Sequence, residues 1–142
     1  MSFTTLARLP DAVAYRDTVA AIDRARCVLM HEQRYLLARH KARRAANRKR
    51  WGLPGGRLSA DELPEDCLRR ELYEELGCRV PDLIELGDWR HRGETHRVFG
   101  CELAQTVERF DEDELCEIQW FTRSQVLRLA KVDRLRTGFE LL

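Results

Sequence analysis

The apolar residues of this chain fall into short runs and one longer stretch with helical spacing. Residues 27–30 and 35–38 are apolar runs separated by polar residues, a pattern typical of a hairpin of two strands buried on both faces. Residues 64–77 begin with Pro64 and end with Gly77, which suit the first position of a helix and the position just past its end. Leucines recur at every fourth position between them, so we predict an amphipathic helix here.

Further apolar runs predict three more strands, at residues 83–86, 98–103 and 118–121. The last of them is followed by Thr122 and, three residues later, Gln125, which together have the form of a capping box that opens a second helix. Strands and helices therefore alternate along the chain. This order favours an α/β fold in which helices cover a mixed sheet.

The composition is that of a globular protein with one domain. The chain has 142 residues, of which 44% are hydrophobic, and we expect residues 1–142 to form a single domain, although residues 1–22 show no clear pattern. No apolar run reaches the length of a membrane span and residues 1–10 lack a secretory signal, so we expect a cytoplasmic protein without membrane partners. Five widely spaced cysteines without a C-x-x-C pair are expected to be reduced structural thiols.

The net charge of +1 hides a separation of sign along the chain. No Asp or Glu occurs between residues 33 and 60, a stretch that holds nine Lys and Arg residues. Residues 61–77 follow with seven acidic residues. Charge runs are most often solvated surfaces, so these two blocks alone do not decide between function classes.

Three acids of the predicted helix lie along one edge of it. At 100° per residue, Glu75 lies about 40° and Glu74 about 60° from Glu71, beside the leucine stripe. Carboxylates at this spacing repel each other only weakly on an exposed helix, and more strongly at the rim of a core. A divalent cation would neutralise them, and Mg²⁺ and Mn²⁺ prefer carboxylate oxygens. The alternative is a solvated helix face.

The residues around these acids resemble the signature of the Nudix hydrolases, the MutT-like pyrophosphohydrolases. Gly56 is followed after five residues by Glu62 and after seven more by Arg70-Glu71-Leu72-Tyr73-Glu74-Glu75-Leu76-Gly77-Cys78. The preceding residues 51–56 also look like the family's approach to this box. Cys78 departs from the usual branched aliphatic residue, which changes packing rather than chemistry. The resemblance implies a Nudix α/β/α sandwich with a central mixed β-sheet.

The resemblance also implies a role for individual residues. Glu71, Glu74 and Glu75 match metal-ligand positions, and Gly55 matches a glycine whose carbonyl oxygen often completes the coordination. Glu62 matches an acid that supports or joins the metal shell, and Arg70 matches an arginine that orients a box carboxylate. The resemblance therefore implies that Glu62, Arg70, Glu74 and Glu75 take part in catalysis.

The implied reaction is hydrolysis, dependent on Mg²⁺ or Mn²⁺, of a phosphoanhydride in a nucleoside diphosphate linked to another moiety. Nucleoside triphosphates and nucleotide sugars are the favoured substrates, because signatures of other substrate classes are not evident beside the box. The basic stretch before the box is expected to attract the anionic substrate, with Arg39 and Arg50 as candidate substrate-binding residues. Trp51 is a candidate for stacking on a base, although large aromatic residues more often belong to the core.

The general base and the partners stay open at this stage. In the family the base is either a box glutamate or an acid from a later loop, for which Glu112, Glu114 and Glu117 are the candidates here. An RNA-binding or RNA 5′-pyrophosphohydrolase module that uses the basic stretch 39–50 is the less favoured alternative. A homodimer is compatible with the sequence. The four histidines have no spacing that groups them.

Overall fold

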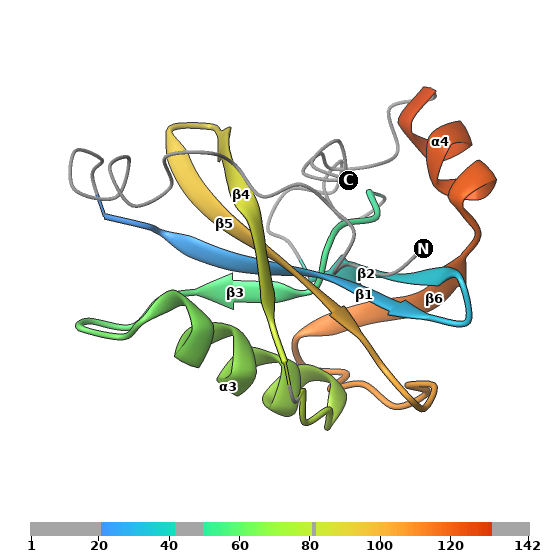
Figure 1. The fold of residues 1–142 in the computed structure, drawn as a ribbon, viewed down its shortest axis with the longest axis horizontal. Coiled ribbons are helices and arrows are strands. Elements are labelled where there is room, and N and C mark those ends of the chain that lie inside the picture. The colour runs from blue at the N-terminus through green and yellow to red at the C-terminus, as the bar shows by residue number, and fades with distance from the viewer. Residues whose placement is uncertain (1–20, 42–49, 81, 132–142) are drawn as a thin grey trace.

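The computed structural model describes residues 21–41, 50–80 and 82–131, which form one mixed sheet with a helix on each face (Figure 1). Strand β1 (Arg24–His31) lies at the centre. The other elements are, in chain order, β2 (Arg34–His40), β3 (Gly55–Arg57), α3 (Pro64–Leu76), β4 (Ile84–His91), β5 (Glu94–Glu102), β6 (Leu115–Phe121) and α4 (Arg123–Lys131). The strand order is β4-β5-β1-β2-β6, and β3 also pairs with β1. Since β1 and β5 run parallel and the other pairs antiparallel, the predicted mixed sheet is confirmed.

Alternate residues of β1 face two separate cores. Cys27 and Leu29 pack in the cluster that contains the leucines of α3. Val28 and Met30 pack in the opposite cluster, which contains Val126 of α4. All four residues are buried, because neighbouring side chains of a strand point to opposite faces and both faces of this sheet are covered by helices. The predicted hairpin of strands buried on both faces is confirmed.

Helix α3 begins and ends where the sequence indicates. Leu63 precedes it in an extended conformation and supplies no side-chain cap, and Pro64 is the first helical residue. Gly77 has a φ of +62°, the left-handed conformation that often ends a helix, and its N–H donates to the carbonyl oxygen of Tyr73 at 2.9 Å. The leucine stripe is buried against the sheet, which holds the acidic edge of α3 beside β3.

The predicted capping box is confirmed at the start of α4. The N–H of Thr122 donates to Oε1 of Gln125 at 2.8 Å, and the N–H of Gln125 donates to Oγ1 of Thr122 at 3.3 Å. Both bonds satisfy backbone donors that the first turn of a helix leaves without partners. No helix in the described parts of the chain is long and apolar enough to cross a bilayer.

The predicted extents of the strands at 83–86 and 98–103 are wrong. They belong to a longer hairpin, β4–β5, whose strands meet at a turn in which Arg92 and Gly93 have φ values of +51° and +79°. The hairpin extends through polar residues because these pair across it. Arg97 donates from Nε and Nη2 to both carboxylate oxygens of Asp88, at 2.8 and 3.1 Å.

Candidate active site

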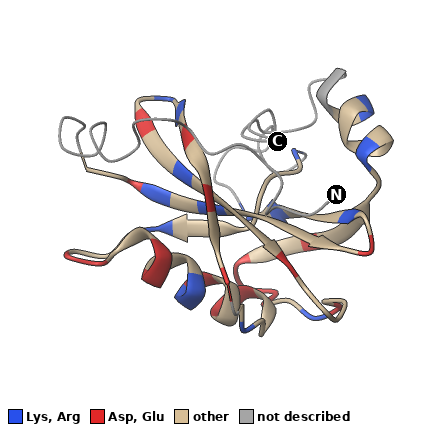
Figure 2. Cartoon of the chain, viewed as in Figure 1, with Lys and Arg blue, Asp and Glu red and all other residues tan. Residues whose placement is uncertain are grey.

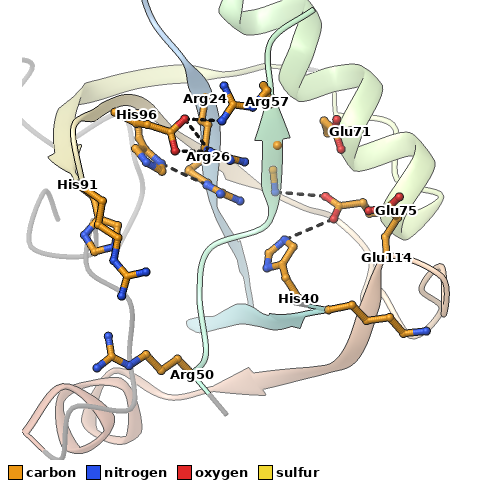
Figure 3. Close-up of a pocket in the computed structure, with 15 residues that line it drawn as sticks. Arg24, Arg26, His40, Arg50, Arg57, Glu71, Glu75, His91, His96 and Glu114 are labelled. Atoms are coloured by element: carbon orange, nitrogen blue, oxygen red, sulfur yellow. Dashed lines mark hydrogen bonds and ion pairs between the residues drawn. The ribbon is translucent and has the colours of Figure 1, made fainter. Parts of the chain in front are cut away.

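A pocket of about 470 Å³ opens between α3, the end of β2 and the β4–β5 hairpin (Figure 3). Its two ends differ in chemistry. One end holds Glu71 and Glu75 of α3, and the other is basic and aromatic. The residues that line it are Arg24, Arg26, His40, Lys41, Arg50, Gly55, Gly56, Arg57, Glu71, Glu75, His91, Arg92, Glu94, His96 and Glu114.

Glu75 is a buried carboxylate at the acidic end. Its side chain is 2% exposed, its Oε1 accepts the N–H of Gly55 at 3.3 Å, and its Oε2 lies 3.4 Å from Nε2 of His40. Burial raises the pKa of Glu75 to about 7, although Arg26 and the N–H of Gly55 act in the opposite direction. The neighbouring Glu71 also has a raised pKa, through burial and the charge of Glu75. A nearby cation would therefore stabilise the charged forms of both carboxylates.

Arg70 and Glu62 form a bidentate pair beside these acids. Arg70 donates from Nε and Nη2 to the two carboxylate oxygens of Glu62 at 2.8 and 3.0 Å. It also donates from Nη1 to Glu71 at 3.0 Å and to Glu74 at 3.3 Å. The hydrogen bonds from Arg70 and from the N–H of Ser59 lower the pKa of Glu62 to about 2. One guanidinium thus connects Glu62 to two acids of the helix, an arrangement that can orient ligand carboxylates.

Glu74 lies on the exposed side of this arrangement. Its side chain is 54% exposed, and it is paired with Arg70 rather than lining the pocket. Of the three helix acids, the structure brings Glu71 and Glu75 together at the pocket wall. Glu74 shares their helix edge, as the sequence predicts.

Gly56 makes room for Glu71. A Cβ atom at this position would lie 2.5 Å from the Cδ of Glu71 and 2.7 Å from each of its carboxylate oxygens. The position of the Glu71 carboxylate therefore depends on the absence of a side chain at Gly56. Gly55, one residue earlier, pairs with Arg26 of β1 and holds Glu75 through its N–H.

The donor set of the acidic end fits a hard divalent cation. Its candidates are carboxylate oxygens and a backbone carbonyl oxygen, which Mg²⁺ and Mn²⁺ prefer. Among the described residues, no three His, Cys, Asp or Glu side chains are already grouped as a metal site. Two observations favour a cation here: Glu75 is buried, and Glu71 lies close to it. Burial and the neighbouring negative charge raise the pKa of these carboxylates, and a bound cation would stabilise their charged forms.

The basic end of the pocket comes from β1, β3 and the β4–β5 hairpin, and Figure 2 shows arginines on β1 and β3 next to the acidic α3. Arg24 donates from Nε to both oxygens of Glu94 at 3.3 Å, and Arg57 donates from Nη2 to the same carboxylate at 2.7 Å. Arg26, which is 8% exposed, donates to Nδ1 of His96 and to the carbonyl oxygen of Leu53, both at 3.4 Å.

The four histidines have no spacing in the sequence that groups them, but the fold brings three of them to this pocket. His40 ends β2, while His91 and His96 lie on opposite strands of the β4–β5 hairpin, with ring centroids 6.3 Å apart. The Trp89 ring contacts both, with centroid distances of 5.0 Å to His91 and 4.6 Å to His96. The register of the hairpin is the signal that would have grouped them. A turn at residues 92–93 pairs Trp89 with His96, and this register places the rings of Trp89, His91 and His96 on one face of the hairpin.

The protein is expected to lose stability in acid through His96. Burial and the charges of Arg26 and Arg24 lower the pKa of His96 from 6.5 to about 4. The unfolded chain therefore binds more protons than the folded one between these values, and the free energy of unfolding falls as the pH drops from about 6.5 to 4. His96→Asn, which keeps an acceptor near Arg26 but cannot titrate, should show a shallower loss in urea denaturation. The interval from pH 7 to 8 is the control, since the difference between the two proteins should be constant there. An unchanged slope in the variant would contradict this.

The three predicted substrate-binding residues lie in different places. Arg50 lines the pocket. Trp51 is 5% exposed and packs in the core, with its ring edge-on to Phe121 at a centroid distance of 5.0 Å. Arg39 lies over the Trp51 ring at 4.5 Å and pairs with Glu117 at 3.3 Å. Neither Arg39 nor Trp51 lines the pocket. The remaining basic residues at 42–49 lie outside the described residues.

The three candidate bases also lie in different places: Glu112 and Glu114 precede β6, and Glu117 is within it. Glu114 lines the pocket, and its carbonyl oxygen accepts the N–H of Lys41 at 3.0 Å. Glu112 is exposed and does not line the pocket, and Glu117 is engaged by Arg39. Of these three acids, the structure therefore places Glu114 nearest to the expected chemistry.

Comparisons with known proteins agree with this arrangement. The sequence model of the NUDIX domain matches residues 21–141. A "MutT-like protein" of Streptomyces ambofaciens is 40% identical over 113 residues, which cover 77% of this chain and 70% of that protein. "Nucleoside triphosphatase NudI" of Enterobacter sp. (strain 638) is 28% identical over 128 residues, covering 79% of this chain and 89% of that protein.

A solved structure has the same fold. The MutT NUDIX hydrolase from Burkholderia pseudomallei superposes with a TM-score of 0.61 at 23% identity, covering 80% of this chain and 99% of that one. This likeness confirms the predicted α/β/α sandwich. Because the domain match spans most of the sequence and carries the complete acidic box of α3, this chain belongs to the Nudix hydrolase family.

Proposed function

We propose that this protein hydrolyses a phosphoanhydride bond in a nucleoside diphosphate linked to another moiety, with a nucleoside triphosphate or a nucleotide sugar as substrate and Mg²⁺ or Mn²⁺ as cofactor. The observation that carries the proposal is the shared pocket. Glu71 and Glu75 project from one helix edge into a cavity whose other walls carry six Lys or Arg residues. A polyphosphate could contact the acidic and the basic walls in one binding mode. Its negative charge is complementary to the basic residues, and a divalent cation could bridge it to Glu71 and Glu75.

In this proposal Gly55, Glu71, Glu74 and Glu75 hold the cation. When bound, the cation would activate the attacking water and neutralise charge on the phosphate oxygens. Glu75 is positioned by the N–H of Gly55, and Glu71 by Arg70, so the chain orients the ligand oxygens before binding. Arg70 is itself held by Glu62. Support for Glu74 comes from its place on the same helix edge.

The protein supplies further groups for the water and the substrate. Glu114, which lines the same pocket near Glu75 (Figure 3), is a candidate to accept the proton of the attacking water, with a box glutamate as the alternative. Arg50 and Lys41 also line the pocket and can bind the phosphate oxygens. The alternative of an RNA partner depended on the basic stretch 39–50, most of which lies outside the described residues. The expected cytoplasmic location accords with five free cysteines, four of them buried.

Phosphate release should require a divalent cation. We expect hydrolysis of at least one nucleoside triphosphate or nucleotide sugar at millimolar Mg²⁺ or Mn²⁺, loss of activity in excess EDTA, and recovery when the metal is restored. The panel should also include dinucleoside polyphosphates and RNA with a 5′-triphosphate. Anion-exchange chromatography of the products is the readout, because nucleotide sugars release no pyrophosphate and a coupling pyrophosphatase would itself lose its metal in EDTA. Activity that persists in EDTA would contradict the metal assignment. Failure to hydrolyse every compound with the metal present would contradict the proposed function.

A further inference from the structure

His40 is the last residue of strand β2 and faces helix α3. It follows Leu36 and Ala38 at intervals of two residues, and both of these pack in the core cluster that contains the leucines of α3. Because alternate side chains of a strand point to the same face, His40 is directed toward this helix as well. Its side chain is 18% exposed and lines the pocket beside Glu75. The end of β2 therefore reaches the acidic end of the pocket.

Two segments that are hydrogen-bonded to each other contact the Glu75 carboxylate. Its Oε1 accepts the N–H of Gly55 at 3.3 Å, and Nε2 of His40 lies 3.4 Å from its Oε2 (dashed lines in Figure 3). Ala38 and Gly52 exchange two backbone hydrogen bonds, of 2.9 and 2.8 Å, which join the end of β2 to the segment that leads to Gly55. Each carboxylate oxygen thus has its own neighbour, and the backbone holds the two neighbours together.

Glu75 is held differently from the other acids of its helix edge. Arg70 donates to Glu71 at 3.0 Å and to Glu74 at 3.3 Å, so the arginine of the box orients these two acids. Glu75 lies deeper, and the charge of Arg26 stabilises its carboxylate. Because the Glu75 side chain is only 2% exposed, protein groups rather than water molecules must contact its oxygens. The direction of this carboxylate is therefore set from the sheet.

We propose that His40 is a positioning residue for the metal site, whose Nε2–H donates to Oε2 of Glu75 and, together with the N–H of Gly55, directs the carboxylate toward the cation. This inference rests on the proposed function, because it requires Glu75 to be a metal ligand. Each carboxylate oxygen has two lone pairs, so an oxygen that accepts a hydrogen bond can still bind a cation. A contact of 3.4 Å is long for a hydrogen bond, and such contacts in active sites commonly shorten when the ligand binds. His40 lies outside the residues that resemble the Nudix signature, so the resemblance assigns it no role.

Metal binding without substrate tests this role. We expect the Kd of the full chain for Mn²⁺, measured from the electron paramagnetic resonance signal of the free ion, to rise about tenfold in His40→Leu, which removes the donor. His40→Gln places an amide N–H near the former Nε2 and should keep the Kd within about threefold of the unaltered value. A Kd that rises equally in His40→Gln and His40→Leu would contradict a donor role.

The matched control is His31→Leu. His31 ends β1 as His40 ends β2, and its side chain is 19% exposed. It contacts the carbonyl oxygen of Leu103 and the ring of Trp120 and does not line the pocket. The loss of this histidine should therefore leave the Kd for Mn²⁺ unchanged.

A double-mutant cycle shows whether His40 acts through Glu75. His40→Leu should weaken Mn²⁺ binding about tenfold in the unaltered protein but less than about twofold in Glu75→Gln, because the ligand that it positions is already impaired. A purely structural role would give the same factor in both backgrounds and would overturn the proposal. Circular dichroism should show that the variants fold. If His40→Leu does not fold, His40→Asn, whose amide is too short to reach Oε2, replaces it in both comparisons.

The outcomes separate this role from the function on which it rests. If Glu75→Gln binds Mn²⁺ as tightly as the unaltered protein, the metal assignment fails together with the role of His40. If Glu75→Gln weakens binding and His40→Leu does not, the role of His40 fails and the proposed function stands. If the Kd values change as expected but no compound is hydrolysed in the presence of the metal, the proposed function fails and the metal site with its positioning residue stands.

Discussion

Glu75→Gln should lower the rate of phosphoanhydride hydrolysis by about 10²-fold or more while leaving the fold intact. The substitution keeps the size of the side chain and its carbonyl oxygen, but removes the charge that would hold a cation. Because Glu75 is 2% exposed and sits against the N–H of Gly55 and the imidazole of His40, little space is left for another group to take its place. Steady-state phosphate release at saturating Mg²⁺ measures the effect.

The control for this experiment is Glu65→Gln. Glu65 lies in the first turn of the same helix, is exposed and does not line the pocket, so its loss should leave the rate within about twofold. Circular dichroism and thermal unfolding should show that both variants fold. Glu74→Gln is expected to lower turnover by about 10²-fold as well, which tests the one proposed metal ligand among the helix acids that does not line the pocket. Wild-type rates in the Glu75 variant would refute its role as a metal ligand.

Gly55→Ala should destabilise the protein by about 3 kcal/mol or more. Gly55 has a φ of +140°, which residues with a side chain rarely adopt, and an added Cβ would lie 2.1 Å from the carbonyl oxygen of Ala25. That oxygen belongs to the backbone of the central strand, so it cannot move aside as the end of a side chain could. The pairing of β3 with β1 must open, and the bond from Gly55 to Glu75 is lost with it. Urea denaturation gives the change in the free energy of unfolding.

Two other glycines separate the causes of this effect. Gly93 also has a positive φ, but a Cβ atom added there would meet nothing within 4 Å, so Gly93→Ala should cost only about 1 kcal/mol of backbone strain. At Gly56 the added Cβ would meet the Glu71 carboxylate, which is the movable end of a side chain. Gly56→Ala should therefore reduce activity more than stability. A Gly55 variant as stable as the Gly93 variant would show that the β1–β3 contact is looser than described.

The local features of the chain were predictable because their causes are local. The bounds of α3 follow from Pro64 and Gly77, and the leucine stripe decides which face is buried. The capping box at Thr122 likewise depends on residues three apart. The acidic edge of the helix is set by the helical repeat alone, so the candidate metal ligands were available from spacing and from resemblance.

The second half of the pocket depends on contacts between residues far apart in the chain. Arg26 and His96 meet because β1 and β5 run parallel in a particular register, and Arg57 joins Arg24 because β3 turns back onto β1. Trp51 and Arg39 were predicted to bind substrate from their position before the box, but Trp51 packs into the core and Arg39 lies over it. Short-range sequence patterns cannot predict such pairings. The direction of side chains alternates along a strand, and the register between two strands depends on the turns and connections that join them.

Spacing along the chain thus accounts for the helix and for the shared edge of Glu71, Glu74 and Glu75, since both arise from residues within a few turns of one another. The sandwich was predicted from the order of the elements and from the family resemblance. The choice of Glu114 among the loop acids, the burial of Glu75 and the basic end built from Arg24, Arg26, Arg57 and His96 came only with the packed sheet. These features are electrostatic, and the energies of charged groups depend on how much water and which other charges lie within a few ångströms in space rather than in sequence.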